Sequence, residues 1–269
     1  MHRGRYLTVS VLLVLIAVGA VLVWRWEHRG PSEPSVSDAI GRFRTSSTLG
    51  TAATEPLIPR AGVYLYDGAG RESVSFLSTK QSQGPTEPGT VVRQPDGCWQ
   101  FRIDFNSFHS HTWSRCSGSN HLTESGGTTT QKFDFATFKM AEHSTVTCRP
   151  FVVADLDAKP GATWPVRCEG KSQTTKATFV QQGVVTFVGR EPVTVDGATV
   201  PAVHTRERLR LTGGQTGTVD IDIWFAADSG LPLNETHRIR VVSPAPPPLG
   251  HVTYAEDGTW HLESATPRT

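Results

Sequence analysis

Three histidines near the middle of the chain have the spacing that comes nearest to a metal site. His109 and His111 stand two positions apart, which places both imidazoles on one face of an extended strand, and His121 follows nearby. Two imidazoles on one face can begin a transition-metal site. No third ligand is evident in the sequence, and exposed histidines on strands are common. The sequence therefore predicts no metal and no other cofactor.

Residue patterns typical of enzymes are not recognisable. The chain has no G-x-S-x-G motif that would place a nucleophilic serine on a constrained turn. The glycine-rich segment 213–217 joins two expected strands, so no helix N-terminus is available there to receive a phosphate. The sequence predicts no catalytic residues and a protein that is not an enzyme.

The four cysteines, Cys98, Cys116, Cys148 and Cys168, bear on the compartment. None belongs to a C-x-x-C pair, so a zinc ribbon is not indicated. An even number of cysteines in an oxidising compartment favours two disulfides, and near-neighbour pairing predicts Cys98–Cys116 and Cys148–Cys168. Four buried free thiols are the alternative.

The first 28 residues look like a membrane anchor. Residues 6–24 carry no charged side chain, and at about 1.5 Å per residue they reach roughly 30 Å, the thickness of a bilayer core. We expect a single-pass transmembrane signal anchor, in contact with the membrane through residues 6–26. The N-terminus would then be cytoplasmic and the rest of the chain extracytoplasmic, in the cell envelope. Cleavage as a signal peptide is the alternative. Residues 29–59 read as a flexible tether with a possible short helix at 37–44.

From residue 60 to residue 269 the apolar pattern has a period of two, which predicts one antiparallel β domain. Turn signals interrupt it, including Gly68–Gly70 and Asp257-Gly258. Strands at 203–211, 218–226 and 233–242 should place charges on their outer face, with Asp220 between Arg210 and Arg240. Their inner face carries an apolar row that we regard as a candidate ligand surface, with a polar mouth at Glu207 and His237. The apolar row consists of Leu209, Leu211, Val219, Ile221, Ile223, Phe225, Ile239 and Val241.

Two short segments carry a resemblance to a known family. Residues 224–233 (WFAADSGLPL) and 159–164 (KPGATW) resemble strand–turn elements of bacterial envelope proteins with a LolA-like or LppX-like fold. Ser37–Arg44 followed by Gly62–Tyr66 is similar to membrane-anchored envelope proteins of high-GC Gram-positive, actinobacterial-type bacteria. The resemblance implies a mainly β fold with a strongly curved antiparallel sheet, an unclosed half-barrel, after one N-terminal transmembrane helix. It also implies that an acyl chain lies on the concave side. The chain lacks the family's long plugging helix and its lipobox cysteine.

Two functions remain open at this point. The first is a membrane-tethered extracytoplasmic domain that binds a lipid or another apolar ligand on the concave face. The alternative is an envelope interaction or scaffold module with a filled core and no ligand, in which Tyr64, Tyr66, Trp113 and Trp224 form an outer contact surface for a protein partner. The formal net charge of +1 gives no reason to expect nucleic acid as a partner.

Overall fold

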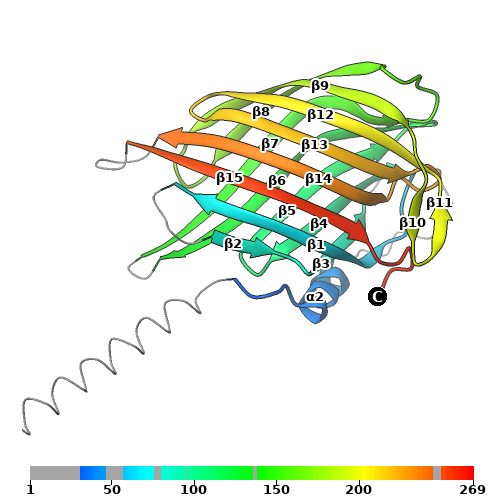
Figure 1. Ribbon diagram of the computed structural model, residues 1–269, viewed down its shortest axis with the longest axis horizontal. Helices are drawn as coiled ribbons and strands as arrows, with labels where there is room; N and C mark the ends of the chain where they lie inside the picture. The colour runs from blue at the N-terminus through cyan, green and yellow to red at the C-terminus, as the bar shows by residue number, and fades with distance from the viewer. Residues whose placement is uncertain (1–30, 47–56, 76–79, 95, 136–137, 245–249) are drawn as a thin grey trace, which may run out of the picture.

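The chain forms a closed antiparallel β-barrel (Figure 1). The computed structural model describes residues 31–46, 57–75, 80–94, 96–135, 138–244 and 250–269. Among these residues, twelve strands follow one another around the barrel in the order β1, β3 to β9 and β12 to β15, and β15 pairs again with β1. Strand β2 lies beside the second half of β1, and β10 and β11 form a separate hairpin at one end.

The bounds of the elements are as follows. One helix, α2, spans Val36–Ser46. The strands are β1 Gly62–Val74, β2 Lys80–Gln83, β3 Thr86–Arg93, β4 Cys98–Asn106, β5 His109–Ser117, β6 His121–Phe135, β7 Phe138–Asp155, β8 Thr163–Ser172, β9 Thr178–Arg190, β10 Val193–Val195, β11 Ala198–Val200, β12 Ala202–Gly213, β13 Thr216–Ala226, β14 Pro232–Pro244 and β15 His251–Leu262.

The prediction of an unclosed half-barrel is wrong, because the first and last strands pair along most of their length. Their register runs from Tyr66 opposite Leu262 to Val74 opposite Tyr254. The sequence signals at Gly68–Gly70 and Asp257-Gly258 predicted turns, yet both lie inside these two long strands. A sheet interrupted at those points has no continuous edges to join. Continuous strands bring the edges together, and closure satisfies their backbone hydrogen bonds.

One end of the barrel is filled by large side chains. Tyr66, Phe101 and Trp260 are fully buried there and contact one another edge to face or tilted, with ring centroids 4.9–6.1 Å apart. Tyr64, Tyr66 and Trp113 also point into the core, so the predicted outer aromatic surface does not form from these residues.

The helix α2 packs on the outside of the barrel wall. Ala39 and Phe43 are buried against Val63 of β1, and Arg42 forms an ion pair with Asp104 of β4. It is longer than the helix expected at 37–44, and it does not plug the barrel (Figure 1). Among the described residues no helix is long and apolar enough to cross a membrane. The expected anchor at residues 1–28 and part of the tether lie outside the described residues.

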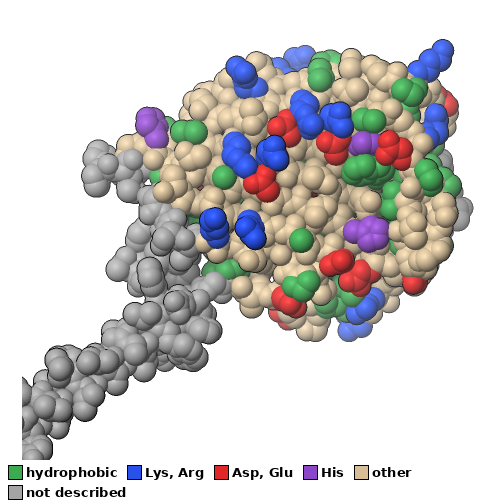
Figure 2. All heavy atoms as spheres, viewed as in Figure 1, with side chains coloured by type: hydrophobic (Ala, Val, Ile, Leu, Met, Phe, Trp, Pro, Cys, Tyr) green, Lys and Arg blue, Asp and Glu red, His purple; other side chains and the backbone are tan. Residues whose placement is uncertain are grey.

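The charged ladder forms on the outer face of β12 to β15 with a register two residues away from the predicted one. Asp220 lies between Arg208 and Arg238 instead of Arg210 and Arg240. A shift of two residues keeps every side chain on its own face, since strand side chains alternate with a period of two. Figure 2 shows the alternating positive and negative side chains on this face. Exposed ion pairs of this kind add little stability each.

Both predicted disulfides are confirmed. Cys98 is bonded to Cys116, and Cys148 is bonded to Cys168. Each pair joins residues directly opposite each other on neighbouring strands, β4 with β5 and β7 with β8. The bonds therefore fix the register of two hairpins of the barrel wall.

Candidate functional site

A cavity of about 650 Å³ occupies the interior of the barrel. Its deep end lies above the aromatic core, near Phe105 and Trp113, and its lining continues to Gln215 and Pro244, where the β12–β13 and β14–β15 hairpins turn. The volume falls within the range of about 300–1,000 Å³ that is usual for sites of small organic ligands.

Eight of the ten predicted ligand-binding residues line this cavity. They are Glu207, Leu209, Leu211, Val219, Ile221, His237, Ile239 and Val241. The other two, Ile223 and Phe225, lie deeper in the core beside a void of about 10 Å³. The inner face of β12, β13 and β14 thus forms one wall of the cavity, as the alternation of their apolar residues indicates.

A second part of the wall comes from strands β6 to β9, which continue the sheet beyond β12, and it was not identified from the sequence. Its apolar lining comprises Phe133, Val146, Phe151, Phe179 and the Cys148–Cys168 disulfide. A sequence signal for this wall existed in the alternation of these strands. Only the curvature of the sheet shows that these side chains and the predicted row line the same cavity.

Acidic side chains gather at the deep end of the cavity around one arginine. Arg115 is buried, its guanidinium lies 5.0–5.6 Å from the ring centroids of Phe225, Trp113 and Trp99, and its Nε donates to Glu124 Oε2 at 3.1 Å. Glu207 lines both the cavity and the small void beside Arg115. Its carboxyl group accepts no hydrogen bond from a described residue. Burial, reinforced by Glu124, raises the pKa of Glu207 to about 8.

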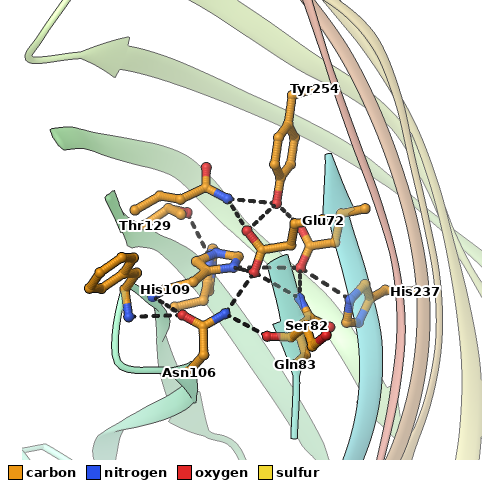
Figure 3. A network of polar contacts seen from close by, with 12 residues as sticks. Glu72, Ser82, Gln83, Asn106, His109, Thr129, His237 and Tyr254 are labelled. Atoms are coloured by element: carbon orange, nitrogen blue, oxygen red, sulfur yellow. Dashed lines mark hydrogen bonds and ion pairs between the residues drawn. The ribbon is translucent and has the colours of Figure 1, made fainter. Parts of the chain in front are cut away.

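A buried polar network adjoins this end of the cavity (Figure 3). Glu72 of β1 and Glu256 of β15 lie directly opposite each other, and both side chains are almost fully buried. Two like charges in such positions repel each other unless donors compensate them. Glu72 Oε1 contacts His109 Nδ1 at 2.9 Å and accepts from Asn106 at 3.2 Å. The hydroxyl of Tyr254 lies 2.8 Å from Glu256 Oε2 and 3.3 Å from Glu72 Oε2.

His237 connects this network to Glu235. Its Nδ1 lies 3.0 Å from Glu235 Oε1, and its Nε2 lies 3.2 Å from Glu256 Oε1. Burial lowers the pKa of His237, but the two carboxylates outweigh burial and raise that pKa to about 10. Burial alone would raise the pKa of Glu256. Its pairing with His109 and His237 outweighs burial and lowers the pKa of its carboxyl group. The network therefore holds charged side chains inside the barrel.

Glycines in β1 and β15 make room for these side chains. A Cβ atom at Gly258 would overlap both Gln83 and His237, and a Cβ atom at Gly70 would overlap Gln83. A larger residue at either strand position would have to displace these buried side chains, so glycine leaves room for the network. These residues are the ones that the sequence suggested as turns.

The three histidines of the sequence analysis do not form a site together. His109 joins the buried network, while His111 pairs with Thr129 at 2.7 Å, and its pKa is lowered to about 3 by burial and by His109. His121 lies at the start of β6, at the other end of the barrel wall. The residues that do meet His109 are Glu72 and Glu256, which lie far from it in the chain. The spacing of these three residues in the sequence does not predict that they are in contact.

Comparisons with protein-family models, with curated proteins and with solved structures find no match for this chain, so its function is inferred from the interior of the barrel.

Proposed function

We propose that the protein is an extracytoplasmic binding protein that holds one apolar ligand, such as the acyl chain of a lipid, inside its barrel. The observation that carries the proposal is the cavity of about 650 Å³, which apolar side chains of β6 to β9 and of β12 to β14 line. Burial of an acyl chain is favourable by about 0.8 kcal/mol for each methylene group removed from water, so transfer of a long chain into the cavity is strongly favoured.

The location is part of the proposal. Two disulfides across neighbouring strands support an oxidising, extracytoplasmic compartment. The apolar run at residues 6–24 supports a place of action next to a membrane, which is also the source of acyl chains. The alternative, an interaction module with a filled core, has less support because Tyr64, Tyr66 and Trp113 are buried.

A matched pair of substitutions tests the binding site. Val219→Trp places an indole in the cavity, whereas Val184→Trp places the same group on the outer face of β9, where Val184 is exposed. We expect Val219→Trp to weaken binding of the neutral fluorescent probe N-phenyl-1-naphthylamine at least tenfold. Val184→Trp should bind the probe as the wild-type protein does.

Native mass spectrometry of the wild-type protein adds an independent reading. We expect a bound lipid that organic solvent removes. Equal probe binding by the two variants, together with a bare protein mass, would contradict the proposal and leave the interaction module as the better reading.

The deep end of the cavity indicates the kind of head group. Glu124 and Glu235 already pair with Arg115 and His237, so Glu207 remains available to a ligand. A ligand carboxylate there would meet three glutamates and two cations that are already paired. We infer that the head group is uncharged or cationic.

A comparison of ten-carbon ligands tests this inference. Decanoate should displace the probe at least tenfold less well than decanol or decylamine at pH 7, a difference of about 1.4 kcal/mol. At pH 9, where Glu207 is ionised, Glu207→Gln should reduce the preference for decylamine, while Glu142→Gln, at another cavity position, should not. Equal displacement by decanoate and decanol would show that the glutamates do not select the head group.

A further inference from the structure

The network beneath the cavity also has the geometry of a metal site. The ligand atoms of Glu72, His109 and Glu256 all lie within 4.8 Å of one another, and all three residues are buried. His109 Nδ1 is 2.9 Å from Glu72 Oε1 and 3.7 Å from Glu256 Oε1. Atoms that surround a tetrahedral ion at about 2.1 Å are roughly 3.4 Å apart, so these separations are close to those of a formed site.

A fourth side chain points at the same carboxylate. The buried Nε2 of His237 has no hydrogen-bond partner among the described residues, and it lies 3.2 Å from Glu256 Oε1. On the other side of the ring, Nδ1 lies 3.0 Å from Glu235 Oε1. A carboxylate behind an imidazole fixes the ring, which is the usual support of a metal-binding histidine, and a metal ion at Nε2 takes the place of the proton that this nitrogen carries in the metal-free barrel.

We propose that Glu72, His109, Glu256 and His237 bind one zinc ion or a similar transition-metal dication. Two imidazoles together with carboxylates suit Zn²⁺, whereas Ca²⁺ and Mg²⁺ prefer oxygen ligands throughout. The two opposed glutamates supply the charge that a dication balances, and this explains why like charges lie opposite each other inside the barrel. The proposal goes beyond binding of an apolar ligand, since it concerns a metal ion held by the polar network in the wall of the cavity.

The surroundings fit an ion that arrives through the cavity. His109, His237 and Glu256 line the cavity, so the site is reachable from it. Asn106 Oδ1 accepts from the backbone N–H groups of Phe108 and His109 at 2.8 Å each, which fixes the turn that carries His109. Gln83 donates to Glu256 Oε1, so its amide must turn aside or present its oxygen to the ion.

The test uses the full chain, stripped of metal with a chelator and titrated with Zn²⁺ by calorimetry. We expect one Zn²⁺ per chain with a dissociation constant below about 1 μM and no binding of Mg²⁺ or Ca²⁺. Thermal unfolding should shift upward in proportion to the logarithm of Zn²⁺ concentration. The visible absorption of Co²⁺-loaded protein should report four-coordinate nitrogen and oxygen ligands.

Substitutions of single residues test which side chains bind the ion. His237→Gln should weaken Zn²⁺ binding at least a hundredfold, and Glu235→Gln about 10–100-fold. His204→Gln is the matched control, because His204 is a buried histidine paired with Asp222 away from the network, and it should bind as the wild type does. Folding of each variant is checked by circular dichroism. If the stripped wild-type protein binds no stoichiometric Zn²⁺, or if folded His237→Gln binds as tightly as His204→Gln, the metal site is refuted. Probe binding in the cavity is measured separately, so it stands or falls independently.

Discussion

The Glu87→Gln variant is expected to be more stable than the wild-type protein at neutral pH, by an amount that grows as the pH rises. Glu87 of β3 is 1% exposed, and neither of its carboxyl oxygens has a hydrogen-bond partner among the described residues. Its side chain lies against Gly68, where a Cβ atom would overlap it. Burial raises the pKa of Glu87 to about 9 from an ordinary value of 4.5. The carboxyl group is therefore protonated in the folded barrel at pH 7.

The sign of the pH effect follows from this pKa. A carboxyl whose folded-state pKa is raised contributes stability that is fully present below its unfolded-state pKa of about 4.5 and is lost as the pH rises toward about 9. Glutamine does not titrate, so the difference in the free energy of unfolding between variant and wild type should grow by about 1.4 kcal/mol per pH unit. Between pH 5 and pH 8 the gain amounts to roughly 4 kcal/mol.

Urea denaturation at pH 5, 6, 7 and 8 measures this difference. The exposed Glu263→Gln variant serves as the control and should follow the wild-type protein at every pH. A difference between Glu87→Gln and wild type that stays constant over this range would show that Glu87 is ionised in the folded barrel, in contact with a cation or with water.

The walls of the barrel were largely predictable because strand alternation is a local property. The apolar row from Leu209 to Val241 was assigned to the inner face even though the register was wrong by two residues, since a shift of two leaves each face unchanged. The disulfides were predictable for the same reason, because each closes a hairpin between neighbouring strands.

Closure and the buried network were not predictable in this way. Pairing of β1 with β15 joins residues at opposite ends of the domain, and no local pattern specifies it. Glycine occurs in turns, but it also occurs within strands where a buried side chain needs the space, as at Gly70 and Gly258. Glu72, His109 and Glu256 become neighbours only once the barrel is closed. The closure and the network were therefore missed together.

Neighbouring carboxylates on β15 should differ widely in their contribution to stability. Glu256 points into the barrel, where it faces His237 and Tyr254 and is 2% exposed, whereas Asp257 points outward and pairs with Arg238 and Arg240 in water. Glu256→Ala should lower the free energy of unfolding by about 3–5 kcal/mol, because it leaves buried positive charge without a partner. Asp257→Ala should cost at most about 1 kcal/mol.

Denaturation with a chelator present, near pH 7, compares the two variants without any contribution from bound metal. The double variant Glu256→Gln with His237→Gln identifies the cause of the loss. If unpaired charge is responsible, the double variant should cost less than the sum of the single variants Glu256→Gln and His237→Gln, by about 0.5–3 kcal/mol. Additive costs, or equal losses for Glu256→Ala and Asp257→Ala, would mean that pairing with the charge of His237 does not stabilise Glu256. The opposed pair Glu72 and Glu256 would then be held by hydrogen bonds from Gln83, Gln131 and Tyr254 without the help of a buried cation.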